Sequence, residues 1–235
     1  MTGVLGHCLE HVYHIDKESP KRLEASPLHL ENHLTLWEDS LDEHIRRLVI
    51  RGTDLRGSGA ANLRLAYLSV KLLICRIQLD FDRHSSHISD VDSVYYTQAR
   101  RVAEEVVDFV RELDEAHCRD FWLPMNAYTL TSATTFLVRC ALTSRGLPNN
   151  PSLRLARAMI DTLGELRRKY AWDIGDNCFN NCSDLIEKIE AAFRQPSSAT
   201  FEFDLEDQIL MDMDLTALND FFSEYSGSFD QSASM

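Results

Sequence analysis

Residues 63–79 read LRLAYLSVKLLICRIQL, and this stretch decides the fold class. Its apolar residues recur at intervals of three and four, which is the period of an α-helix. They are Leu63, Ala66, Tyr67, Val70, Leu73, Ile74 and Ile77. The remaining faces carry Leu65, Leu68, Leu72 and Leu79. Because a helix that is apolar on nearly all sides avoids water, the stretch is predicted to lie buried at the centre of the fold.

Other segments with helical periodicity surround this one. The predicted helices cover about residues 28–49, 99–113, 124–142, 151–170 and 183–193. In the first of them the residues expected to face inward are Leu30, Leu34, Trp37, Leu41, Ile45 and Leu48. Ser183 is expected to cap the last helix, and Pro151 suits the first turn of the one before it. No segment shows the alternation of a strand. We therefore predict an all-α fold of about seven helices, in one domain over residues 1–195.

Residues 196–235 differ from the rest of the chain in their charge. No Lys or Arg follows Arg194, and nine carboxylates lie between Phe201 and Asp230. Of the net charge of −13, this segment holds −9. The acids alternate with bulky apolar residues after a Pro-Ser-Ser sequence at 196–198. Such a composition is typical of a segment that stays disordered until it binds a partner, so we predict a disordered acidic C-terminal tail.

The apolar residues of this tail are the candidate partner-binding residues. Leu215, Leu218, Phe222 and Tyr225 form one stripe at helical spacing, and Leu205 and Ile209 begin a second stripe. The expected contact residues are Leu205, Ile209, Leu215, Leu218, Phe221, Phe222 and Tyr225. Against an apolar groove rimmed by Lys and Arg, the tail can fold with its aromatic side chains inward. The alternatives are a final helix docked on the body, or a solubilising tail.

The composition also bears on where the chain acts. No stretch approaches the ~18 consecutive apolar residues of a membrane span, and the N-terminus lacks the pattern of a signal peptide. The six cysteines, most of them far apart, suit a reducing compartment. Backbone phosphates are bound by clustered Lys and Arg, and the sequence shows no such patch. We expect a cytosolic or nuclear protein that does not itself bind nucleic acid or membrane.

Two groups of residues have spacings that a metal ion accepts. His7, His11 and His14, beside Cys8, would share one face of a helix, and Cys178 and Cys182 are one helical turn apart. Neither spacing is that of a known zinc site. A polar helix face and a helix start are the preferred interpretations, so no metal site is predicted.

Motifs of catalysis are incomplete in this sequence. Gly57-Ser58-Gly59 lacks the lysine of a phosphate-binding loop and is interpreted as a helix connection. Asp80-Phe81-Asp82 and the residues 219–223 resemble fragments of the aspartate motifs of helical terpene synthases, without the full set of acids. The metalloprotease and nucleophile-elbow motifs are absent from the sequence. We predict that the chain is not an enzyme.

Two arginines stand inside otherwise apolar helical segments. A buried guanidinium is costly unless it meets a carboxylate or carbonyl, or extends to the surface. Arg76 and Arg139 are therefore expected to have a structural role, and they are also the candidates for an internal polar or ligand-binding site.

A series of short motifs occurs in a distinctive order. The series starts with Leu34-x-x-Trp37-x-x-x-Leu41 and Leu72-Leu73-x-x-Arg76. It continues with Ala99-Arg100-x-x-Ala103, and ends with Phe121-Trp122-Leu123-Pro124 leading to Thr131-Ser132-Ala133. This order resembles the later part of the regulatory domain of fungal zinc binuclear-cluster (Zn2Cys6) transcription factors. The resemblance covers about residues 1–170.

The resemblance implies a fungal transcriptional regulator acting with RNA polymerase II. Residues 1–195 would be its regulatory domain and the tail its activation segment. The family's DNA-binding module opens with C-x2-C-x6-C, which this sequence lacks, so zinc would belong to a missing module and no cofactor is expected here. The expected partners are coactivators or general transcription machinery through the tail, and a second copy of the chain. The expected location is the nucleus, with shuttling to the cytoplasm. The alternative is a helical protein-interaction module without transcriptional activity.

Overall fold

The computed structural model describes residues 3–4, 6, 8, 27–85, 94–143 and 150–194. These residues contain helices and no strands, which confirms the predicted all-α class. Their eight helices are α2 (Pro27–Asp39), α3 (Glu43–Val49), α4 (Ala60–Ser85), α5 (Val94–Arg111), α6 (Glu115–Cys118), α7 (Met125–Thr143), α8 (Pro151–Tyr170) and α9 (Asp176–Arg194). The predicted tail, residues 196–235, lies outside the described residues.

The chain divides into two compact units. Unit 1 is Met1–Leu123 and contains α2 to α6, whereas unit 2 is Pro124–Met235 and contains α7 to α9. The boundary falls inside the Phe121–Pro124 motif, within the stretch that the sequence patterns treated as one domain.

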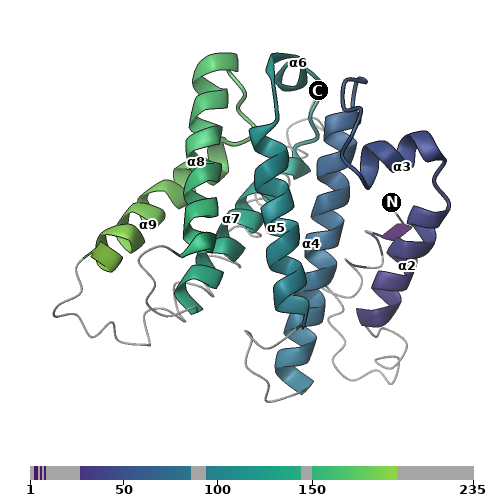
Figure 1. Cartoon of the computed structure of the whole chain (residues 1–235), viewed down its shortest axis with the longest axis horizontal. Helices are drawn as coiled ribbons and strands as arrows, with labels where there is room; N and C mark the ends of the chain where they lie inside the picture. The colour runs from purple at the N-terminus through teal and green to yellow at the C-terminus, as the bar shows by residue number, and fades with distance from the viewer. Residues whose placement is uncertain are drawn as a thin grey trace, which may run out of the picture. The chain divides into compact units, whose positions relative to one another are not determined.

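Unit 1 is built around α4. Figure 1 shows α4 beside α5, and α2 and α3 also pack against α4. Leu65, Leu68, Leu72 and Leu79 lie along one face of α4 and are all buried. On the opposite face, Ala66, Val70, Ile74 and Ile77 are buried as well. The prediction that residues 63–79 lie at the centre is confirmed for this unit, because packing on several sides removes the apolar surface of α4 from water.

The predicted helix over 28–49 is wrong, because the chain breaks between α2 and α3. The Ser40 hydroxyl donates to the carbonyl of Trp37 at 2.7 Å. The Asp42 side chain then accepts a hydrogen bond from the amide of Ile45 at 2.9 Å and caps the new helix. Short polar side chains of this kind compete with the helical backbone for its hydrogen bonds. As a result Leu41, expected to face inward, lies only half-buried in the connection.

Unit 2 is a set of three helices that pack against one another in every pair. Asn150 caps α8, and Pro151 follows in the first turn as predicted. Arg157 on α8 makes a two-bonded ion pair with Glu190 on α9, with N–O distances of 3.1 and 2.9 Å. This pair raises the pKa of Arg157 and fixes the register of the two helices.

Helix α9 begins seven residues earlier than its predicted cap at Ser183. It starts at Asp176, so Cys178 and Cys182 lie in its first two turns, and both are fully buried. A free cysteine in an apolar setting behaves as a small hydrophobic residue, and this pair supplies the buried face that the polar segment 176–184 otherwise lacks.

Gly175 permits the close approach of the α8–α9 connection to α8. A Cβ atom at this position would lie 2.6 Å from Cδ2 of Leu163, a side chain that is itself buried. We expect Gly175→Ala to lower the free energy of unfolding by about 1–3 kcal/mol, because the buried leucine must shift to admit a methyl group. Chemical denaturation followed by circular dichroism measures the change.

Gly57→Ala is the matched control for this substitution. Its Cβ atom would lie 3.9 Å from the Cβ of Ala60, an ordinary contact. We expect a change within about 0.5 kcal/mol at this position. Equal effects of the two substitutions would show that the space at Gly175 has no particular role.

Candidate functional site

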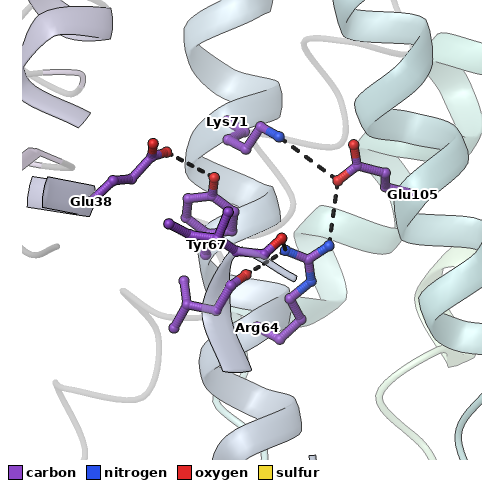
Figure 2. A network of polar contacts seen from close by, with 7 residues as sticks. Glu38, Arg64, Tyr67, Lys71 and Glu105 are labelled. Atoms are coloured by element: carbon purple, nitrogen blue, oxygen red, sulfur yellow. Dashed lines mark hydrogen bonds and ion pairs between the residues drawn. The ribbon is translucent and has the colours of Figure 1, made fainter. Parts of the chain in front are cut away.

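Arg64 is the one charged residue that is buried in the part of the chain that the structure describes. Its Nη1 atom donates to the carbonyl oxygens of Val49 and, at 3.0 Å, Ile50, which end helix α3. Its Nη2 atom lies 3.4 Å from Oε2 of Glu105 on α5 (Figure 2). A cation at the C-terminal end of a helix satisfies carbonyls that have no partner within the helix. Arg64 therefore joins α3 and α5 to α4.

Three further side chains complete what we name the Arg64 network, which consists of Glu38, Arg64, Tyr67, Lys71 and Glu105. The Tyr67 hydroxyl donates to Oε1 of Glu38 on α2 at 2.8 Å, and Nζ of Lys71 lies 3.7 Å from Oε2 of Glu105. Burial and the carboxylate of Glu38 raise the pKa of Tyr67 far above its usual value, so its hydroxyl remains a donor. The network links α4 to α2, α3 and α5.

Cation–π and ring contacts centre on the same tyrosine. Cζ of Arg64 lies 5.6 Å and Nζ of Lys71 lies 5.4 Å from the centroid of the Tyr67 ring. The ring of Trp37 on α2 is 6.1 Å away, centroid to centroid. Desolvation lowers the pKa of Arg64, and Glu105 opposes that shift. Among described residues the network thus uses its charges to hold helices in place.

Unit 2 has a different polar cluster, formed by sulfur and hydroxyl groups. Sγ of Cys178 lies 3.2 Å from Oγ1 of Thr134 on α7, and Cys182 lies one helical turn further along α9. The neighbouring thiol of Cys182, together with burial, raises the pKa of Cys178. The thiol of Cys178 in turn lowers the pKa of Cys182.

Neither of the two arginines singled out in the sequence is fully buried. Arg76 on α4 and Arg139 on α7 are each half-buried, and they belong to different units. The stretches that contain them are apolar, but both residues keep some access to water. Their role as an internal polar or ligand-binding site remains a prediction.

Several other predicted features lie wholly or partly outside the described residues. These are His7, His11 and His14 and the tail residues Leu205, Ile209, Leu215, Leu218, Phe221, Phe222 and Tyr225. Cys8, next to the first histidine, is described and buried. Within residues 3–4, 6, 8, 27–85, 94–143 and 150–194, no three His, Cys, Asp or Glu residues come together as metal ligands. In the same ranges no helix has the length and apolarity that crossing a bilayer requires.

The glycine-rich segment is a helix connection, as its sequence predicts. The Ser58 hydroxyl donates to Oδ1 of Asp120 at 2.9 Å, and the amide of Gly59 donates to the other oxygen of this carboxylate. These hydrogen bonds lower the pKa of Asp120. The hydrogen-bond donors of this connection are therefore already bonded to a carboxylate of the same unit.

The sequence contained a signal for the Arg64 network that its apolar pattern obscured. Arg64, Lys71 and Gln78 are spaced by seven residues, which places them on one side of α4. All three meet carboxylates, because Nε2 of Gln78 donates to Oε2 of Glu31 on α2 at 3.0 Å. A polar stripe with a seven-residue repeat along a buried helix is therefore the pattern that indicates such contacts.

Comparison with known proteins gives no relative for this arrangement. No protein-family model matches the chain, and no curated protein and no solved structure is significantly similar to it.

Proposed function

We propose that this chain is the regulatory and activating portion of a fungal-type transcriptional regulator. Support comes from where the motifs of the resemblance lie in the fold. Leu34, Leu72 and Ala103 belong to three different motifs and lie on α2, α4 and α5, and each is buried. Ala133, from the last motif, is buried on α7. Motif residues on each of these four helices are thus core positions, whereas Phe121 and Leu123 of the last motif are exposed.

The buried polar contacts of the helical part of the chain are suited to a structural role rather than to catalysis. The Arg64 network directs its hydrogen bonds to neighbouring helices. Its carboxylates already have partners, because Glu105 meets Arg64 and Lys71 and Glu38 accepts from the Tyr67 hydroxyl. Such fixed internal contacts specify one helical arrangement. In the proposed function this helical part receives regulatory signals, and the acidic tail contacts coactivators or general transcription machinery in the nucleus.

A reporter assay tests the proposal with the full chain. Residues 1–235 are fused to an unrelated DNA-binding domain, and the same fusion carries Leu218→Ala, Phe221→Ala and Phe222→Ala together. We expect the parent fusion to activate the reporter and the triple variant to fall to the level of the DNA-binding domain alone. The reason is that apolar side chains supply most of the affinity of an acidic segment for its partner.

The matched control is the triple variant Ser226→Ala, Ser228→Ala and Ser232→Ala. It changes the same number of residues in the same segment without removing bulky apolar groups, so it should retain activation. A parent fusion that does not activate would reject the proposal and favour a helical interaction module. Equal loss in both variants would show that the bulky apolar residues have no particular role.

A further inference from the structure

Ser58 carries an exposed hydroxyl in the connection between α3 and α4. This connection runs from the end of α3 at Val49 to the start of α4 at Ala60. Ser58 lies between two glycines, and a Cβ atom added at Gly59 would meet nothing within 4 Å. Open space and a glycine on each side let another enzyme draw this stretch of backbone into its own active site.

The charge close to Ser58 in the sequence is positive. Arg56 precedes the serine by two residues, and residues 55–61 contain no Asp or Glu. Arg56 is exposed, and so is Arg51 at the beginning of the same connection. Serine kinases select their substrates largely by the pattern of charge around the serine. These surroundings therefore fit a kinase whose peptide groove is acidic, and they do not fit one that selects acidic residues.

We propose that Ser58 is a phosphorylation site for a serine kinase that selects basic residues. In the transfer, Oγ of Ser58 attacks the γ-phosphorus of ATP. A bond forms between this oxygen and phosphorus, the bond from phosphorus to the oxygen that bridges the β- and γ-phosphates breaks, and ADP leaves. The hydroxyl proton passes to the catalytic aspartate of the kinase. The modification is independent of the proposed function.

The hydroxyl of Ser58 supplies one of the hydrogen bonds that hold Asp120 at the start of α4. It donates to Oδ1 of Asp120 at 2.9 Å, while the amide of Gly59 donates to the other carboxylate oxygen. A phosphate on Ser58 replaces this donor with a second anion beside the carboxylate, and the two repel each other. The phosphate is covalently attached where the helix favours negative charge, so the carboxylate is the group that leaves.

Release of Asp120 acts on the residues that follow it directly. Oδ1 of Asp120 also accepts a hydrogen bond from the amide of Phe121 at 2.8 Å. The amide of Leu123 donates to Oδ1 of Asn62 on α4 at 3.0 Å. Residues 120–123 are thus attached to the start of α4 through two side chains, and one of them is the carboxylate that contacts Ser58. Phosphorylation of Ser58 therefore loosens residues 120–123.

Phosphorylation of the folded full-length protein, mapped by tandem mass spectrometry, tests the site. The protein is incubated with Mg-ATP and either protein kinase C, which selects basic residues, or casein kinase II, which selects acidic ones. We expect protein kinase C to phosphorylate Ser58 about tenfold faster than casein kinase II does. Arg56→Gln should slow the reaction at Ser58, because it removes the charge by which the kinase selects this serine.

Ser40→Ala is the matched control for Ser58→Ala. Ser40 is also an exposed serine between two helices, but it is flanked by Glu38, Asp39, Asp42 and Glu43. Ser58→Ala should remove the phosphate that protein kinase C adds at this position, and Ser40→Ala should leave it in place. The proposal is overturned if Ser58 is not phosphorylated, if casein kinase II modifies it faster, or if Arg56→Gln leaves the rate unchanged.

Amide hydrogen exchange, measured by mass spectrometry, tests the structural consequence. The peptide that contains residues 120–123 should exchange several-fold faster in the phosphorylated protein than in the unmodified one. Asp120→Asn removes the carboxylate charge, so it should raise the exchange of this peptide without phosphorylation, and phosphorylation should then add little. Unchanged exchange after phosphorylation, or an equal increase in Asp120→Asn, would overturn the predicted release. Circular dichroism of each variant confirms that it is folded, and phosphorylation that requires unfolding also overturns the proposal.

Discussion

Arg64→Met is expected to lower the free energy of unfolding by about 3 kcal/mol, since it leaves two carbonyl groups at the end of α3 without their donor. Methionine retains the aliphatic bulk, so the change isolates the guanidinium. Loss of the ion pair with Glu105 adds little, because that carboxylate is 42% exposed and keeps its contact with Lys71. The main cost comes from buried backbone groups.

Denaturant unfolding, followed by circular dichroism and by tryptophan fluorescence, measures this loss. Trp37 packs against Tyr67, so one of the three tryptophans that contribute to the emission lies beside the network. Arg51→Met is the control, since Arg51 pairs with Glu43 at 3.1 Å on the surface and should contribute about 0.5 kcal/mol. If both variants lose the same amount, the burial of Arg64 has no energetic consequence.

Asn150→Ala is expected to cost about 2–3 kcal/mol in unit 2, because one side chain serves two helices. Oδ1 of Asn150 accepts a hydrogen bond from the amide of Ser152 at 2.9 Å and caps α8. Nδ2 of the same residue donates to the carbonyl of Ala141 on α7 at 3.2 Å. Alanine removes both bonds and leaves a buried carbonyl without this donor.

Asn150→Ser separates the two contributions. A serine hydroxyl can still cap the helix but cannot reach the carbonyl of Ala141, so about 1 kcal/mol of the loss should be recovered. Thermal and denaturant unfolding of the three proteins under one set of conditions supplies the comparison. A serine variant as unstable as the alanine variant would contradict the assigned capping role.

The helices were predictable from the sequence where their apolar period is long. The stretch 63–79 and the helix after Pro124 were located correctly, because repeated packing contacts leave a regular pattern. The break between α2 and α3 was missed, since the apolar spacing continues through Leu41 while Ser40 and Asp42 end and restart the backbone hydrogen bonds. The start of α9 was missed because Cys178 and Cys182 were not counted as apolar face residues.

The buried charge was not predictable from local sequence. Arg64, Arg76 and Arg139 all lie in apolar surroundings along the chain, and only the first is buried. What distinguishes Arg64 is Glu105, 41 residues away, and the end of α3, about 14 residues away. Such partners become neighbours only through the packing of α3, α4 and α5. The seven-residue repeat of polar side chains on α4 was the available indication.

The division at Leu123 and Pro124 also has a consequence for the order of folding. Helices α2, α3 and α5, which pack on α4, come from residues before the boundary, and α7, α8 and α9, which pack on one another, come from residues after it. Because a chain is synthesised from its N-terminus, Arg64 can meet Glu105 while α7 to α9 have yet to leave the ribosome. Unit 1 can then form its internal ion pairs before unit 2 has been released from the ribosome. Contacts between near segments in each unit also reduce the loop entropy that folding must overcome.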